Sequence, residues 1–230
     1  MHAENPFETR YREYDAWFDA NENLFASELL AVRALAPPPP TLPRPNGSPP
    51  RWVEIGVGSG RFASALGIPL GVEPADGIAT LARARGVDVI QGVAEALPLE
   101  DASVEVGFLI TSLCFIDDEA RAFAELARVL TPGGIAIVAF IPADSPFGRL
   151  YTNPGEDDPF FRRAQLRSRV EIVAALASAG FRLDRAVHTL TGDPQHANDR
   201  VEEPSDGWDA GSFVVLRAIK TDPDGPEQEL

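Results

Sequence analysis

The chain has 230 residues, which is the usual size of one domain and is long enough to bury a core without disulfides. Its 35 acidic residues outnumber its 20 basic residues, and the formal net charge is −15. We therefore expect no nucleic-acid partner, because binding phosphates needs clustered cations. The single cysteine excludes an intramolecular disulfide.

No apolar run approaches the ~18 residues that are needed to cross a membrane. Residues 1–9 also lack the apolar segment of a signal peptide. We therefore predict a cytoplasmic protein with no membrane partner. Histidines and carboxylates nowhere have the spacing of metal ligands, so we predict no metal. The sequence carries no indication of the oligomeric state.

Both ends of the chain differ in composition from its centre. Residues 1–36 are predicted to form a helical lid segment, because aromatic residues from Phe7 to Phe18 recur at the spacing of one helical face. Residues 37–50 are rich in proline and are predicted to be an extended tether. Residues 222–230 are acidic and are predicted to be a disordered tail.

Between residues 51 and 221, apolar runs of strand length alternate with helical patterns. Strands are predicted at residues 52–55, 70–72, 87–90, 104–110, 135–141, 181–190 and 212–219. Helices are predicted at residues 62–66, 78–84, 119–130 and 168–180. This alternation indicates right-handed crossovers and a doubly wound sheet with helices on both faces.

Two segments interrupt the alternation. Residues 142–167 combine prolines with aromatic residues and are predicted to be irregular. Residues 191–211 are long, polar and rich in proline and glycine, which is typical of a functional loop. Between them, Ser168 and Glu171 have the spacing of a capping box that opens a helix.

A loop of alternating glycines, Glu54-x-Gly56-x-Gly58-x-Gly60, follows the first predicted strand. Open α/β sheets bind ligands at the carboxyl ends of their strands, and glycine lets a ligand approach the backbone closely. The nicotinamide fingerprint would require a glycine at the position of Arg61. The loop therefore favours a nucleoside cofactor without a pyrophosphate over a nicotinamide cofactor.

Two acids accompany this loop. Glu73, followed by Pro74, ends the second strand 17 positions after Gly56, where a carboxylate can accept hydrogen bonds from two ribose hydroxyls. The alternative is a solvated acid at a strand end. Glu54 could accept from an ammonium group of the cofactor, hold the loop through backbone amides, or be purely structural.

Four motifs in this order resemble class I, Rossmann-like methyltransferases that use S-adenosylmethionine, and in particular the small type 11 group. They lie at residues 53–60, 71–74, 91–99 and 130–134. The resemblance runs from about Tyr14 to Lys220. It implies an α/β fold with a doubly wound, mostly parallel seven-stranded sheet, an antiparallel last strand and an N-terminal helical lid.

The resemblance also implies the cofactor-binding residues. The loop at residues 91–99 would frame adenine, but Val93 stands where the family often has Asp or Asn, so Ala94 and Glu95 would supply the polar contacts. The segment after the fourth strand would line the methionine moiety and the methyl-transfer point. The full set of expected cofactor-binding residues is Glu54, Gly56, Gly58, Gly60, Glu73, Pro74, Ala94, Glu95, Thr111, Ser112 and Leu113.

Aromatic side chains are the candidates for the acceptor site. The expected substrate-binding residues are Tyr14, Trp17, Phe147, Tyr151 and Phe160. We interpret Phe7 and Phe18 as ordinary core packing, and Cys114 as a small buried thiol rather than a nucleophile.

The candidates for a catalytic role are Tyr14 and His196, although an amine that is already deprotonated needs no general base. His188, on a predicted strand, is interpreted as a satisfied half-buried residue.

The sequence thus predicts an S-adenosylmethionine-dependent methyltransferase, with S-adenosylhomocysteine as product. A methyl group would move from the sulfonium to an O, N or C nucleophile of a small molecule by in-line displacement, mainly through positioning. Two alternatives stay open. One is a non-catalytic regulatory protein that binds the same cofactor, and the other is an NAD-dependent oxidoreductase.

Overall fold

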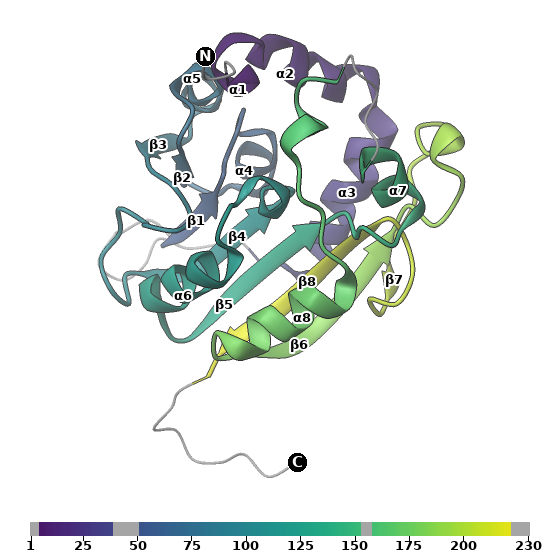
Figure 1. The fold of residues 1–230 in the computed structure, drawn as a ribbon. Helices are drawn as coiled ribbons and strands as arrows, with labels where there is room; N and C mark the ends of the chain where they lie inside the picture. Colours follow the sequence, from purple (N-terminus) through teal and green to yellow (C-terminus); the bar gives the residue numbers. More distant parts are fainter. Residues whose placement is uncertain (1–4, 39–50, 153–157, 222–230) are drawn as a thin grey trace.

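The computed structural model describes residues 5–38, 51–152 and 158–221 (Figure 1). Most of the predicted tether and all of the predicted tail lie outside these residues. Within them, no helix combines the length and the apolar character that crossing a membrane requires.

The described residues form one sheet of eight strands in the order β3-β2-β1-β4-β5-β8-β6-β7. The first five strands of this order are parallel, and β8 is antiparallel to both β5 and β6. The strands are β1 (Trp52–Ile55), β2 (Leu70–Glu73), β3 (Asp88–Gln91), β4 (Val104–Ile110), β5 (Leu130–Phe140), β6 (Phe181–Thr189), β7 (Ser205–Asp206) and β8 (Phe213–Lys220). The predicted doubly wound sheet is confirmed. The eighth strand, β7, was not predicted, because a strand of two residues is too short to show an alternation of apolar and polar side chains.

The beginning of β5 differs from the prediction. The motif at residues 130–134, which precedes the predicted strand at 135–141, is part of β5: Leu130 pairs with Val104 and Ile135 with Val106, so residues 131–134 form a bulge against β4. Gly133, with φ at 69°, supplies the backbone conformation that the bulge needs. The preceding helix therefore ends at Val129, one residue earlier than predicted.

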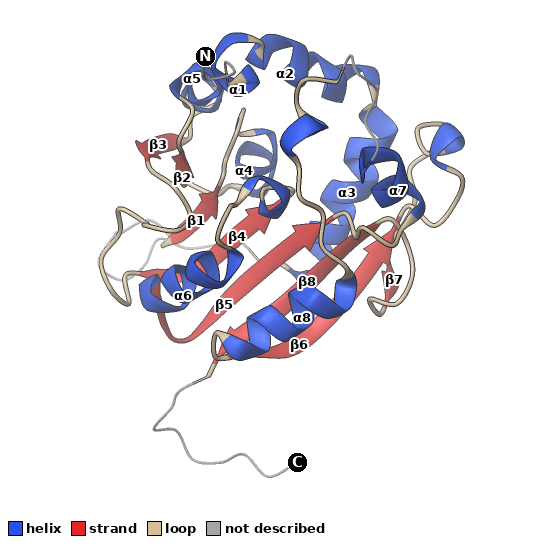
Figure 2. Cartoon of the chain, viewed as in Figure 1, coloured by secondary structure: helices blue, strands red, loops and turns tan. Residues whose placement is uncertain are grey.

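Helices cover both faces of the sheet (Figure 2). The helices are α1 (Pro6–Thr9), α2 (Tyr11–Ala20), α3 (Glu22–Leu35), α4 (Arg61–Leu66), α5 (Asp76–Ala84), α6 (Glu119–Val129), α7 (Pro146–Thr152) and α8 (Arg169–Ser178). The capping box predicted at Ser168 and Glu171 is present at the start of α8. One core cluster packs α6 and α8 on the sheet, and the other packs α3 and α4 on the opposite face.

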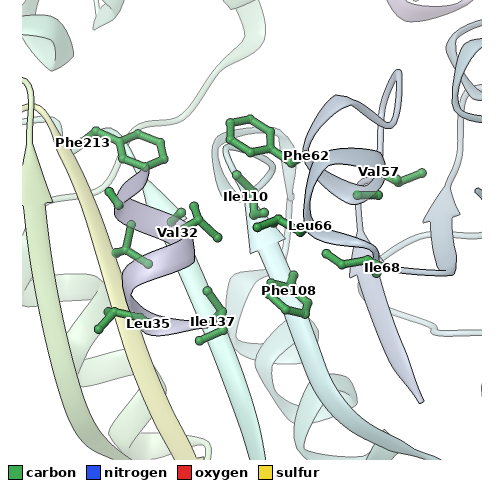
Figure 3. Packing of buried hydrophobic residues seen from close by; sticks show 14 of the residues in the cluster. Val32, Leu35, Val57, Phe62, Leu66, Ile68, Phe108, Ile110, Ile137 and Phe213 are labelled. Atoms are coloured by element: carbon green, nitrogen blue, oxygen red, sulfur yellow. The ribbon is translucent and has the colours of Figure 1, made fainter. Parts of the chain in front are cut away.

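The two clusters meet at the central strands. On β4, Phe108 and Ile110 point into the cluster of α3 and α4, whereas Leu109 points into the cluster of α6 and α8. This is the alternation of a pleated strand that is buried on both faces. Figure 3 shows Phe108 and Ile110 packed with Phe62 and Leu66 of α4. Packing on both faces holds the central strands in place, so their carboxyl ends form a rigid edge of the sheet.

The N-terminal segment is helical, as predicted, but its aromatic stripe does not lie on one continuous helix. The chain leaves helical geometry at Arg10, with ψ at 16°, and at Asn21, with ψ at 47°. The resulting short helices bend around the sheet, and α1 and α2 lie across the edge at which β1 and β4 end (Figure 1).

The two interrupting segments are partly ordered. The first was predicted to be irregular, but it contains α7, which begins at Pro146, a residue that suits the first turn of a helix. The second holds a short 3-10 turn, Pro194–His196, and the strand β7. Figure 1 places α7 near the carboxyl end of β5, on the same side of the molecule as α2.

Candidate active site

Two adjoining cavities lie where the central parallel strands end. The glycine-loop cavity, bounded by Gly56, Gly58 and Glu73, has a volume of about 370 Å³. The aromatic cavity, bounded by residues such as Phe147 and Tyr151, has a volume of about 540 Å³. Both volumes are typical of small-molecule sites, whose usual range is about 300–1,000 Å³. The two cavities share the wall residues Tyr14, Thr111, Phe115, Pro159 and Phe160.

Two glycines of the loop, Gly56 and Gly58, line the glycine-loop cavity. Gly56 has φ at 74°, and a side chain there would lie 2.5 Å from the Cβ atom of Ser112. Its amide donates to the carbonyl of Val72, which ties the loop to β2. Gly60 differs, because it does not line the cavity; a side chain there would lie 2.8 Å from Ala82. Of the three predicted glycines, Gly56 and Gly58 meet the cavity, and Gly60 lets α4 pack on α5.

Glu73 joins the loop to the second strand. Its Oε2 accepts from the amide of Gly58 at 2.9 Å, and its Oε1 accepts from the amide of Ala75 at 3.0 Å. Burial raises the pKa of Glu73, and these two amides oppose the rise. Each carboxylate oxygen can accept more than one hydrogen bond, so Glu73 can hold the loop and still accept from a ligand. Pro74 lines the cavity beside it.

Glu54 lies beneath the loop and on neither cavity wall. It is 2% exposed, and burial raises the pKa of its carboxyl well above the usual range, against an opposing hydrogen bond from the amide of Ala63. Its Oε2 has no hydrogen-bond partner among the described residues. This position favours the interpretation of Glu54 as a support of the loop over direct contact with a ligand.

The predicted adenine loop forms the far end of the first cavity. Val93 and Ala94 both line it, and Val93 is 44% exposed. Glu95 also lines it, but its Oε1 already accepts from the amides of Asp117 at 3.0 Å and Asp118 at 3.3 Å. Asp117 lies on the same wall and was not predicted, because no motif extends to it. It brings a carboxylate to the end where Val93 supplies none.

The segment after β4 connects the two cavities. Thr111 lines both and has φ at 53°, a left-handed conformation that β-branched residues rarely adopt. Such conformations cost about 1–3 kcal/mol and concentrate at functional sites. Ser112 Oγ donates to the carbonyl of Ile55 at 2.9 Å and lines the glycine-loop cavity. Leu113 lines only the aromatic cavity.

Aromatic rings separate the two cavities. Tyr14 contacts Phe7 at 5.2 Å and Phe160 at 5.4 Å between ring centroids. The interpretation of Phe7 as ordinary core packing is wrong, because Phe7 is only half-buried, belongs to neither core cluster and lines the glycine-loop cavity. Phe18 is buried in the core as expected, and also borders the aromatic cavity.

All five predicted substrate-binding residues line the aromatic cavity. Phe147 is buried beside Tyr151, whose ring stacks on Phe161 at 4.3 Å. Trp17 is 38% exposed and lies at the rim. The structure therefore brings α2, α7 and the segment that starts at Asp158 together around one space.

Glu28 is a charged residue of this wall that was not predicted from the sequence. It lies on α3, is 4% exposed, and has no hydrogen-bond partner among the described residues. Burial raises the pKa of its carboxyl from 4.5 to about 8. A signal was available, because Leu24, Glu28, Ala31 and Leu35 recur at helical spacing on the buried face of α3. A carboxylate within such a stripe points to an unusual environment.

The remaining candidates differ in position. Cys114 lies near the carbonyl of Thr111, and burial raises the pKa of its thiol to about 12, which agrees with its interpretation as an unreactive thiol. His188 is buried and contacts the carbonyl of Gly207 at 3.1 Å, as expected of a satisfied residue. His196 is exposed, faces Asp199 at 3.0 Å, and lies on neither cavity wall. No metal-binding group of His, Cys, Asp and Glu is found in the described ranges.

Partly buried ion pairs hold α2 on the glycine loop. Asp15 accepts from Nε of Arg61 at 2.7 Å and from Nη2 of Arg85 at 2.8 Å. Arg85 also donates to the carbonyl of Ser59 inside the loop. Burial would raise the pKa of Asp15, but the hydrogen bonds from both arginines outweigh it and hold the pKa at about 2. Arg61, which breaks the nicotinamide fingerprint, thus anchors the lid.

A second contact holds α1. The carboxylate of Glu8 accepts from the amides of Asp76 at 3.0 Å and Gly77 at 2.8 Å, at the start of α5. A side chain at position 77 would lie 2.4 Å from the Glu8 carbonyl oxygen, so the close approach requires glycine. With the Asp15 ion pairs, this contact places the lid over both cavities.

The sheet order, the glycine loop and the acid that ends β2 define a Rossmann-like methyltransferase. A family model for a methyltransferase domain, type 11, matches residues 53–138. The chain belongs to the class I S-adenosylmethionine-dependent methyltransferases, and the predicted family is confirmed.

Three relatives illustrate the similarity. A solved S-adenosylmethionine-dependent methyltransferase of Thermotoga maritima, named a possible histamine N-methyltransferase, is 38% identical, with a TM-score of 0.83, over 94% of this chain and 98% of its own. An uncharacterized protein of Methanocaldococcus jannaschii is 33% identical over 94% of this chain and 99% of its own length. A probable S-adenosylmethionine-dependent methyltransferase of Mycolicibacterium smegmatis is 28% identical over 74% and 71%.

Proposed function

We propose that the chain transfers the methyl group of S-adenosylmethionine to a small molecule bound in the aromatic cavity. The observation that carries this proposal is the shared wall: Tyr14, Thr111 and Phe160 border both cavities. A cofactor in one cavity and an acceptor in the other would therefore meet at these residues. Holding two reactants in such an arrangement can supply much of the rate enhancement of a displacement.

The residues of the glycine-loop cavity fit the cofactor. The Glu73 carboxylate is placed to accept from ribose hydroxyls, and the glycine backbone leaves room for close approach. Asp117 and the backbone around Ala94 offer polar groups for the adenine end. When bound, the cofactor supplies a sulfonium-activated methyl group, whose carbon–sulfur bond breaks as the bond to the acceptor forms.

Positioning explains the site better than acid–base catalysis does. Burial raises the pKa of Tyr14, so its phenol stays neutral at physiological pH and forms part of the wall rather than acting as a base. His196 lies on neither wall. Phe115 and Phe160 instead place apolar rings at the junction of the cavities, which would limit the access of water to the reacting groups. The name of the Thermotoga relative supports nitrogen as one of the acceptor atoms.

The experiment that tests this proposal uses labelled S-adenosylmethionine. The full chain is incubated with the labelled cofactor and a pool of small metabolites, and we expect label in a new small product. Glu73→Ala should weaken binding of S-adenosylhomocysteine and lower labelling at a fixed cofactor concentration, whereas His196→Gln, outside both cavities, should change neither.

Two outcomes would contradict the proposal. Binding of S-adenosylhomocysteine without any labelled product from a broad pool would identify a regulatory binder. Binding of NADH with no binding of S-adenosylhomocysteine would favour an oxidoreductase.

A further inference from the structure

Glu28 is unusual among the charged groups of the aromatic cavity because no group of the described chain balances it. The others on this wall each have a partner: Arg10 with Glu13 at 2.5 Å, Arg167 with Glu119 at 3.6 Å, and Asp158 with the amide of Phe160 at 3.0 Å. A buried carboxyl group normally has a hydrogen-bond or charge partner, because removing it from water is otherwise costly. The natural partner of Glu28 is therefore a ligand.

Two phenols share the cavity with this carboxyl group. Tyr14 of α2 and Tyr151 of α7 line the same cavity, and neither hydroxyl has a hydrogen-bond partner among the described residues. Burial raises the pKa of both, and the charge of Glu28 adds to the rise. One carboxyl group and two phenols thus line the same cavity, whose wall is otherwise mainly apolar, and the carboxyl group is near enough to influence both phenols. Aromatic faces and a carboxylate together are the chemistry that binds ammonium groups.

We propose that Glu28, with Tyr14 and Tyr151, binds a basic nitrogen of the acceptor and so selects amines as substrates. This inference rests on the proposed function, which assigns the aromatic cavity to the acceptor. Because Tyr14 also borders the glycine-loop cavity, an amine held by Glu28 would lie close to the junction of the two cavities.

Proton release gives this subsite a distinctive signature. Burial holds Glu28 mainly in its neutral form at pH 7. When an ammonium group binds, the pair carries one proton fewer, whichever of the two groups holds the shared proton. Amine binding at pH 7 should therefore release about one proton to the buffer. The groups that face Glu28, Tyr14 and Tyr151, have pKa values raised far above this range and contribute none.

Calorimetry with matched ligands tests the proposal. The full chain, saturated with S-adenosylhomocysteine, is titrated with 2-phenylethylamine and tryptamine, and with their alcohol counterparts, 2-phenylethanol and tryptophol. We expect at least one amine to bind about 10–100-fold more tightly than its alcohol, the range of a hydrogen bond to a charged group. Heats measured in phosphate and in Tris should give about one proton released for each amine bound.

Variants separate recognition from folding. Glu28→Gln should abolish both the amine preference and the proton release, while its affinity for the alcohols and for S-adenosylhomocysteine stays unchanged. Tyr151→Phe keeps the ring and should weaken only amine binding. The control, Glu22→Gln, removes an exposed carboxylate from the same helix and should behave as the wild type.

The outcomes also distinguish this inference from the proposed function. An amine preference that survives in Glu28→Gln, or the absence of any preference in the wild type for both pairs, overturns the inference. If label from the cofactor reaches an acceptor and Glu28→Gln leaves the preference for amines unchanged, the amine subsite is refuted and the proposed function stands. If amines bind through Glu28 but no acceptor is ever labelled, the proposed function fails and the subsite stands.

Discussion

Glu28 has no partner in the described chain, so its burial should oppose folding once the carboxyl group ionises. Replacing it with glutamine keeps the shape of the side chain and removes the ionisation. We therefore expect Glu28→Gln to be more stable than the wild type in the absence of ligands, by an amount that grows with pH. Residues that serve binding often reduce stability in this way.

The size of the effect follows from the pKa. Burial raises the pKa of Glu28 from 4.5 to about 8. The folded state therefore binds the proton of Glu28 more tightly than the unfolded state does. The stabilisation of the fold by this proton is complete below pH 4.5 and is lost as the pH rises through 8. Each pH unit between these values lowers the free energy of unfolding by about 1.4 kcal/mol relative to the glutamine variant. The loss amounts to about 3 kcal/mol at pH 7 and about 5 kcal/mol well above pH 8.

Urea unfolding at pH 5, 6, 7, 8 and 9 measures this difference, with the fluorescence of the buried Trp52 as the signal. Glu54 and Glu73 also have raised pKa values, but they are present in both proteins and cancel in the difference. Glu22→Gln reports the effect of losing an exposed carboxylate. A difference between Glu28→Gln and the wild type that stays within about 0.5 kcal/mol from pH 5 to 9 would refute the reasoning.

Three further predictions concern the cofactor loop and the lid. Glu73→Ala should weaken binding of S-adenosylhomocysteine by about 1–3 kcal/mol in calorimetry, the scale of a charged hydrogen bond; unchanged affinity would remove Glu73 from the ribose. Gly56→Ala should weaken the same binding and cost about 1–3 kcal/mol of stability, since its side chain would meet Ser112; thermal unfolding at wild-type temperature would contradict this. Asp15→Asn should lower stability by about 2 kcal/mol in urea unfolding, because Arg61 and Arg85 lose the partly buried carboxylate that they share; a neutral effect would show that these ion pairs do not hold the lid.

The sheet and the cofactor loop could be predicted from the sequence because their signals are local. Buried parallel strands read as continuous apolar runs, as at residues 135–141. The glycines at 56 and 58 are required by the backbone itself, one of them by a contact 2.5 Å from Ser112. Such constraints act over a few residues, so a single sequence displays them.

The acceptor side could be predicted only in part, because its geometry depends on contacts between distant segments. The aromatic residues of that wall were recognisable, but not that Phe7 and Phe160 would meet at 5.4 Å across 153 positions of the chain. The engagement of Glu95 with two backbone amides is equally non-local. Glu28 was detectable as a charge on an apolar helix face, but its lack of a partner is a property of the folded chain.

The ion pairs of Asp15 with Arg61 and Arg85 have a consequence for engineering new acceptor specificities. Arg61 directly follows Gly60, and Arg85 donates a hydrogen bond to the carbonyl of Ser59. Because both arginines also bind Asp15, the N-terminal helices and the glycine loop are joined to each other. A chimera that takes its N-terminal helices from a relative would have to exchange positions 15, 61 and 85 together. Exchanging the helices alone would leave Arg61 and Arg85 without the Asp15 carboxylate and would loosen the helices that cover the aromatic cavity.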